Sequence, residues 1–290
     1  MGTLIGQALV NGILLGGIYA AFSAGFSLIF GVMGVVNLAH GELVMVGAFI
    51  TYWIFYLFGF DPFLTIPVSF AVLFALGYLL QRFIINRVIE EPPIMSYLVT
   101  FGIHLVIANV ALLWWTADFR TVTSSYSGIN FSVAGLVVPC GRLATFGIAL
   151  VMVGLLYCLV HKTDMGLAIQ ATAQDKQMAR LVGIDVARVY AMTFGLGAGI
   201  TGLSGSLVST YFVIFPFMGM EYTLIAFCVV VLGGMGYIPG ALIGGMILGV
   251  LQSFTATFLS AGLSMALTFV VLFAALVVRP AGIVGRGIVE

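Results

Sequence analysis

Three polar residues stand close together in the first long apolar block of the chain: Asn37, His40 and Glu42. An imidazole and a carboxylate could share a metal ion or transfer a proton. On a helix, however, positions two apart project from different faces, so His40 and Glu42 do not make a two-ligand metal site. No nucleophile or further ligand in the sequence completes an intramembrane catalytic site around them. Ionisable groups at membrane depth usually face a bundle interior or water. This leaves two roles: a structural hydrogen-bond cluster or the lining of a translocation path.

A second polar region, residues 161–188, holds 7 of the 20 charges of the chain (10 Lys and Arg plus 10 Asp and Glu). Thr163 or Asp164 is a suitable N-cap for a helix here, and Gly183 is a suitable end. Two interpretations follow: a solvated connector between spans, or a docking helix that a soluble partner grips. Apolar residues recur through the segment at helical spacing, at Leu167, Ala171, Met178, Leu181 and Val182.

The composition places these polar regions in a membrane protein. Hydrophobic residues make up 62% of the chain and charged residues 7%, against about 25% charged in globular domains. The apolar runs are continuous rather than alternating, which excludes a β-barrel and predicts an all-α polytopic integral membrane protein. No polar segment is long enough to fold alone, so residues 1–290 are expected to form a single transmembrane domain. Zero net charge gives no basic surface for nucleic acid.

Apolar runs broken by charges, Pro and Gly predict about eight or nine spans, and the segments flanking Gly34 and Gly236 are candidates for broken or re-entrant helices. Eight of the ten basic residues fall in the 82–93 loop, the 161–188 loop and the C-terminal tail that contains Arg286. The positive-inside rule therefore predicts that these are cytoplasmic, that the 116–141 loop is extracytoplasmic, and that the N-terminus is outside. The predicted spans are near 8–31, 38–58, 64–86, 94–116, 142–161, 189–211, 218–237, 240–259 and 262–279.

Glu221 is the only acidic residue between positions 189 and 278. It stands near the outer end of a predicted span, where it could anchor the interface or line an outer vestibule. Several glycine pairs have GxxxG spacing, which predicts close helix packing. Two such pairs are Gly12 with Gly16 and Gly245 with Gly249.

Three stretches, VMGVVNLAHGELVMVGAF, the Thr163-to-Ile184 loop and VVLGGMGYIPGALIGGMILGV, resemble the permease subunits of branched-chain amino acid ABC importers of the LivH type. The resemblance covers nearly the whole chain. Gln170 stands where the family frequently has Arg. The residues that fit the family's loop pattern are Thr163, Gly166, Ala171, Ala173, Asp175, Ala179, Gly183 and Ile184.

The resemblance implies an ABC importer permease fold in a bacterial inner membrane, with no catalysis and no cofactor of its own. A substrate-binding protein outside would deliver solute to this chain and a second, homologous permease. Two cytoplasmic ATPases, which carry ATP and Mg²⁺, would dock on the coupling loops of the permeases and drive alternating access, and residues 161–188 would be the coupling loop of this chain. Asn37, His40, Glu42 and Glu221 are the candidates for the translocation path.

Three alternatives stay open. The solute could be urea, a short amide or another small organic molecule rather than a branched-chain amino acid. The chain could be a channel or ion-coupled carrier that uses the four path candidates, in which case transport would persist without ATP. It could also be an intramembrane enzyme, although no full set of catalytic residues can be assembled.

Overall fold

The computed structural model describes residues 1–123, 128–133, 135–279 and 282–284. Positions 124–127 and 134 of the expected 116–141 loop, and Arg286 of the expected cytoplasmic tail, lie outside the described residues. The helices are α1 (Gly2–Met33), α2 (His40–Phe58), α3 (Ile66–Phe83), α4 (Pro93–Trp115), α5 (Cys140–Lys162), α6 (Asp164–Gln174), α7 (Lys176–Leu181), α8 (Val186–Ser209), α9 (Gly219–Gly233), α10 (Ile238–Phe258) and α11 (Ala261–Val278), with 3-10 turns at Pro62–Thr65 and Ile85–Arg87.

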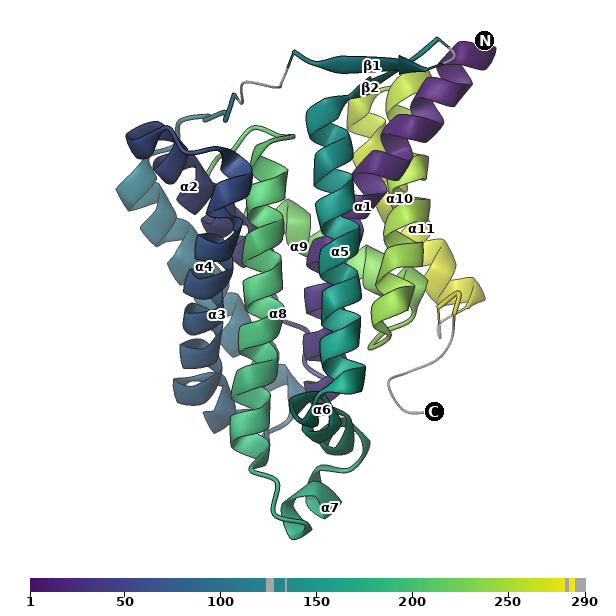
Figure 1. The fold of residues 1–290 in the computed structure, drawn as a ribbon. Coiled ribbons are helices and arrows are strands. Elements are labelled where there is room, and N and C mark those ends of the chain that lie inside the picture. The colour runs from purple at the N-terminus through teal and green to yellow at the C-terminus, as the bar shows by residue number, and fades with distance from the viewer. Residues whose placement is uncertain (124–127, 134, 280–281, 285–290) are drawn as a thin grey trace.

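Long helices run roughly parallel or antiparallel through one bundle (Figure 1). Among the described residues, eight helices are long and apolar enough to cross a membrane. The predicted spans coincide with α1–α5 and α8–α11, with ends displaced by a few residues, except that α1 already begins at Gly2. Helices α6 and α7 lie at the end of the bundle opposite the N-terminus, as Figure 1 shows. We call these two ends the α6–α7 end and the hairpin end.

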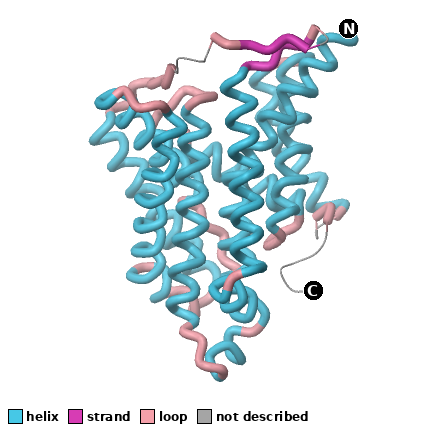
Figure 2. Tube along the Cα trace, viewed as in Figure 1, coloured by secondary structure: helices cyan, strands magenta, loops and turns pink. Residues whose placement is uncertain are grey.

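The hairpin end takes its name from two short strands, β1 (Asn130–Val133) and β2 (Leu136–Pro139). They pair antiparallel, with Asn130 opposite Pro139, and they lie across the end of the bundle beside the N-terminus (Figure 2). Gln7 of α1 holds the hairpin in place: its amide donates to the carbonyl of Val137 at 2.8 Å and accepts from the Val137 N–H at 2.9 Å. From the sequence, only a loop was expected at residues 116–141.

Helices α1 and α8 form the centre of the bundle, because 83% and 94% of the residues in their membrane-spanning stretches are buried. The close packing predicted from GxxxG spacing is confirmed between α1 and α10. A Cβ atom added at Gly16 would lie 2.7 Å from the Cα of Met246, and one added at Gly249 would lie 2.5 Å from the Gly16 nitrogen. Only glycine allows two backbones to approach so closely.

The predicted break near Gly34 is also confirmed. Gly34 adopts φ 64°, a left-handed conformation that suits glycine, and its N–H closes the last turn of α1 on Phe30. Residues 34–39 then run without regular structure until α2 begins at His40. Near Gly236, whose φ is 84°, the short helix α9 ends and α10 begins. With 15 residues, α9 is about 22 Å long, less than the ~30 Å hydrocarbon core.

Candidate functional site

The first turn of α2 lies inside the bundle rather than at its surface. His40 contacts the carbonyl of Phe22. Phe22 lies about 16 Å along the axis of α1 from the end of that helix at Met33. The segment 34–39 therefore turns back alongside α1 before α2 begins. Asn37 makes this turn possible, because its side-chain oxygen accepts the N–H of Ala39 at 3.0 Å and its carbonyl accepts the N–H of His40 at 3.2 Å.

His40 ties α2 to α1 and α8. Its Nε2 lies 2.9 Å from the carbonyl oxygen of Phe22 and 3.1 Å from the hydroxyl of Thr201. A carbonyl can only accept, so Nε2 carries the proton and donates. The Thr201 hydroxyl donates to the carbonyl of Gly197 at 2.7 Å. His40 is fully buried, and this geometry fits a structural hydrogen-bond cluster.

Glu42 is also fully buried, and its partner is His104 of α4, with Oε1 2.8 Å from Nδ1. On the other side Glu42 packs against Gly219, where an added Cβ would collide with the carboxylate. Glu42 and His104 are far apart in the sequence, and no local pattern pairs them. Ser96 and Thr100 continue the same polar stripe along α4 at intervals of four residues, and both are buried.

Thr223 of α9 completes this cluster. Its hydroxyl accepts the N–H of Gly41 at 2.8 Å and lies 3.3 Å from the carbonyl of Leu38. The freed backbone groups of the broken helix are thus satisfied by side chains from neighbouring helices, as membrane depth requires. Among the described residues, no group of three or more His, Cys, Asp or Glu could hold a metal ion.

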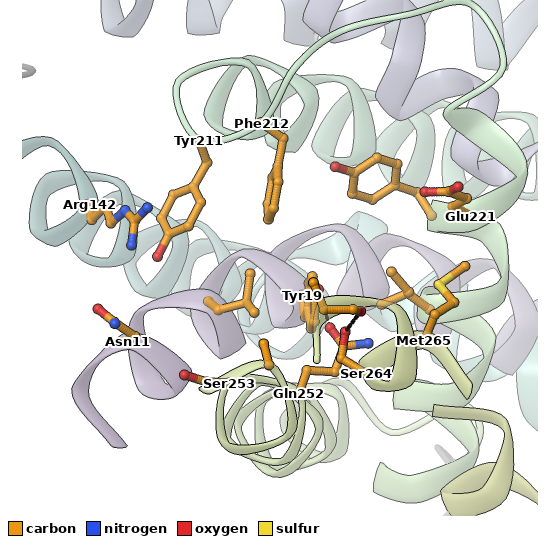
Figure 3. Close-up of a pocket in the computed structure, with 15 residues that line it drawn as sticks. Asn11, Tyr19, Arg142, Tyr211, Phe212, Glu221, Gln252, Ser253, Ser264 and Met265 are labelled. Atoms are coloured by element: carbon orange, nitrogen blue, oxygen red, sulfur yellow. Dashed lines mark hydrogen bonds between the residues drawn. The ribbon is translucent and has the colours of Figure 1, made fainter. Parts of the chain in front are cut away.

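Nearer the hairpin end, a cavity of about 500 Å³ lies between α1, α5, α9, α10 and α11 (Figure 3). Of the four predicted path residues only Glu221 lines it. Arg142 stands on the opposite side of the cavity, with its guanidinium 4.2 Å above the ring of Tyr211. Arg142 was not among the predicted site residues, because no local sequence pattern places it on the same cavity as Glu221.

The floor of this cavity is a buried polar chain across three helices. The hydroxyl of Tyr19 donates to Oε1 of Gln252 at 2.5 Å, and Nε2 of Gln252 donates to the hydroxyl of Thr268 at 2.6 Å. Apolar walls come from residues such as Leu15 and Ile225. A cavity of this size, with an apolar body and a few placed polar groups, is typical of small-molecule sites.

At the α6–α7 end, the predicted 161–188 helix is two short helices rather than one. Asp175 adopts an extended backbone (φ −151°), which ends α6, and its carboxylate accepts the N–H groups of Gln177 and Met178 at 2.7 and 3.0 Å, which begins α7. Thr163 caps α6 by accepting the N–H of Gly166 at 3.0 Å. Gly183, at φ 89°, follows α7 in a left-handed conformation.

The remaining predicted residues of this region pack inward. Gly166 lies against the carbonyls of the last turn of α5, and Ala179 is buried. Ile184 closes the turn after α7 by donating its N–H to the Ala179 carbonyl at 3.0 Å. Ala171 is half-buried, and so is Ala173.

Helix α7 and the residue that follows it expose three large apolar side chains among charged and polar ones. Leu181, Val182 and Met178 are 79%, 76% and 60% exposed. Beside them, Arg180 forms an ion pair with Glu90 of the 82–93 loop. The neighbouring Arg180 guanidinium lowers the pKa of the Glu90 carboxyl.

A second cavity, of about 680 Å³, lies beside the turn that joins α6 and α7. It is lined by residues 172–177, the end of α1 at 30–34, the corner at Met235 and Gly236, and the side chains of Ile89 and Tyr190. The turn between α6 and α7 and both broken-helix corners therefore line the same cavity.

Comparison with known proteins gives one consistent result. Residues 8–276 match the family described as "Branched-chain amino acid transport system / permease component". The chain is 30% identical to BraD of Pseudomonas aeruginosa, a high-affinity branched-chain amino acid transport system permease protein, over 98% of this chain and 97% of that protein. It is also 30% identical to LivH of Escherichia coli, a permease protein of the same kind of system, over 98% of this chain and 96% of that protein.

Among solved structures, PsaBC from Streptococcus pneumoniae, in complex with Fab, aligns with a TM-score of 0.51. The alignment covers 96% of this chain and 92% of that one, at 12% identity. At this identity the likeness concerns the fold.

Proposed function

Because the chain belongs to the family of permease components of branched-chain amino acid transport systems, we propose that it carries leucine, isoleucine or valine inward as one permease subunit of an ATP-driven importer. It is a multi-pass membrane protein of an ABC importer. The substrate is supported by relatives that are similar over nearly their full length. The chain itself catalyses no reaction in this proposal, and it holds no cofactor.

The α6–α7 end faces the cytoplasm of a bacterial inner membrane and the hairpin end faces outward. This orientation is supported by the basic residues, since Arg82, Arg87, Lys176, Arg180 and Arg188 lie in or beside segments of the α6–α7 end. A substrate-binding protein delivers solute at the hairpin end. A second, homologous permease completes the path through the membrane.

Two ATPase subunits, which hold ATP and Mg²⁺, dock on the coupling loops of the two permeases, and α6 and α7 form this loop in the present chain. The observation that carries this step is the exposed apolar surface of Met178, Leu181 and Val182 on a short helix outside the membrane-spanning bundle. Amphipathic helices seat such a surface in a groove of a partner. Thr163, Asp175 and Gly183 position the two helices through their caps and turns.

The path itself uses the cavity of Figure 3 as its outer vestibule, with Glu221 in its wall. Asn37, His40 and Glu42 do not line this cavity and act on the path indirectly. They hold the first turn of α2 against α1, α4 and α8, so they shape the path through backbone position. Replacing Glu221 with Gln should change transport without loosening the fold, whereas loss of His40 should destabilise it.

The contact of buried Glu42 with partly exposed His104 favours one competing function, an ion-coupled carrier, because ionisable residues inside membrane helices often mark ion pathways. Such a carrier would work without ATPases. A permease for urea or a short amide would keep the same partners and differ in the solute that the binding protein retains.

Purification from the native membrane in mild detergent tests this proposal. We expect two ATPase subunits and a second, related permease to remain bound after size-exclusion chromatography. A chain that stays alone or forms only homo-oligomers, under conditions where cross-linking preserves complexes, would contradict it.

A further inference from the structure

The cavity of Figure 3 contains an arginine whose charge no carboxylate neutralises. Arg142 lines this cavity from the first turn of α5 and is half-buried. No described Asp or Glu lies within ion-pair distance of its guanidinium. The other arginine outside the α6–α7 end, Arg120, has a structural use, because its guanidinium donates to the carbonyl of Trp115 at 2.7 Å. Arg142 makes no hydrogen bond of this kind to the backbone, so its donors are available to a ligand.

The hydroxyl of Tyr211, which lines the same cavity, is a buried donor without an acceptor. The Arg142 guanidinium lies 4.2 Å above the Tyr211 ring, but an arginine side chain can only donate hydrogen bonds. In the part of the chain that the structure describes, the Tyr211 O–H donates to no group. Buried polar groups in native proteins nearly always have a partner. The cavity is where such a partner for Tyr211 can bind.

A third donor comes from α1. The side-chain oxygen of Asn11 accepts from the amide of Gln7 at 3.3 Å, and the amide nitrogen of Asn11 donates to none of the described residues. Gln7 also binds the backbone of Val137 in the strand that leads into α5. This part of α1 therefore lies beside the start of α5, and Asn11 lines the cavity there.

The two ends of the cavity carry opposite charge. Figure 3 shows Arg142, Tyr211 and Asn11 toward one end and Glu221 at the other. The first turn of α5 contains no acidic residue, so the partial positive charge of this helix N-terminus adds to that of the guanidinium. Apolar side chains such as Leu15 line the cavity as well. This combination suits a small zwitterion with an apolar side chain.

We propose that Arg142, Tyr211 and Asn11 form a carboxylate subsite, which receives the α-carboxylate of an apolar amino acid as it enters the permease. The planar guanidinium matches a carboxylate in geometry and charge, and the hydroxyl and the amide supply further donors. The ammonium group of the amino acid faces the Glu221 end. This subsite rests on the proposed function, because the cavity must lie on the solute path. It adds that the permease itself selects for a carboxylate, which urea and short amides lack.

Saturation-transfer difference NMR on the importer complex in nanodiscs, without the binding protein, tests this subsite. The probes are L-leucine, isocaproate, which keeps the carboxylate and lacks the ammonium group, and L-leucinamide, which keeps the ammonium group and lacks the carboxylate. We expect L-leucine and isocaproate to compete for one site. L-leucinamide should bind at least tenfold more weakly, because it offers no charged acceptor to the three donors.

Variants assign the preference to these side chains. Arg142→Gln should weaken L-leucine binding at least tenfold and remove the preference for L-leucine over L-leucinamide. Tyr211→Phe keeps the ring beside the guanidinium and should weaken L-leucine binding about fivefold. Two controls should bind L-leucine like the wild type: Arg188→Gln, which removes an exposed charge at the α6–α7 end, and Tyr157→Phe, which removes an exposed hydroxyl from α5 outside the cavity.

Absence of L-leucine binding, equal binding of L-leucine and L-leucinamide by the wild-type complex, or unchanged L-leucine affinity in Arg142→Gln and Tyr211→Phe would overturn the proposal. If Arg142→Gln does not assemble with its partner subunits, the ligand series and Tyr211→Phe decide. Uptake of L-leucine by proteoliposomes is measured in parallel. ATP-driven uptake without a carboxylate preference in the NMR experiment would refute the subsite and leave the proposed function standing, whereas uptake that needs no ATP would refute the proposed function.

Discussion

Leu181 offers the sharpest test of ATPase docking on α7. Its side chain is 79% exposed, and in the proposed complex it is buried in an apolar groove of the ATPase. Replacing it with Ala removes three carbons at about 0.8 kcal/mol each. Scaled by the exposed fraction, Leu181→Ala should cost about 2 kcal/mol of binding free energy, which corresponds to a roughly 30-fold loss of ATPase affinity.

The assay is a titration of the purified ATPase subunits against the permease pair in nanodiscs, with a fluorescent label on the ATPase. Leu113→Ala is the matched control, because Leu113 is 80% exposed but lies in the membrane-spanning helix α4. The control should bind ATPase like the wild type. If the Leu181→Ala and Leu113→Ala permeases both bind the ATPase with wild-type affinity, α7 is only a connector and does not dock the ATPase.

Three further predictions concern stability and pH. Gly16→Val should lower the free energy of unfolding by about 1–3 kcal/mol, because the added side chain would meet the backbone of α10. A thermal unfolding curve in detergent that matches the wild type would contradict this. Glu42→Ala and His104→Ala should show a coupling of about 0.5–3 kcal/mol in a double-mutant cycle; additive losses would mean that the two side chains do not interact. Arg180 lowers the pKa of the Glu90 carboxyl, so the stabilisation from this ion pair is present at neutral pH and is lost as the pH falls through the lowered pKa. Amide hydrogen exchange in α7 should therefore accelerate at acidic pH. Equal exchange rates at neutral and acidic pH, after correction for the intrinsic pH dependence of exchange, would contradict this prediction.

The spans could be predicted from the sequence because each must carry about 20 apolar residues across a water-free layer. The break at Gly34 was also predictable, since Asn37, His40 and Glu42 would be unfavourable on a lipid-facing helix. GxxxG spacing correctly placed Gly16 at a close helix contact, because two apposed glycines leave room for backbone contact and little else.

The rest depends on contacts between residues distant in the sequence. The pairing of Glu42 with His104 and the chain from Tyr19 through Gln252 to Thr268 join separate helices, and no local pattern encodes them. The division of 161–188 into two helices comes from the backbone of Asp175, whose side chain can either continue a helix surface or cap a new helix.

In the proposed importer, ATP hydrolysis by partner subunits drives solute through this chain. The most direct measurement is uptake of radiolabelled L-leucine by proteoliposomes that hold the complete complex, with the binding protein outside. We expect uptake only when ATP and Mg²⁺ are enclosed, with no response to an imposed proton or sodium gradient. Uptake without ATP that follows an ion gradient would contradict the account and assign the Glu42–His104 pair to an ion-coupled carrier.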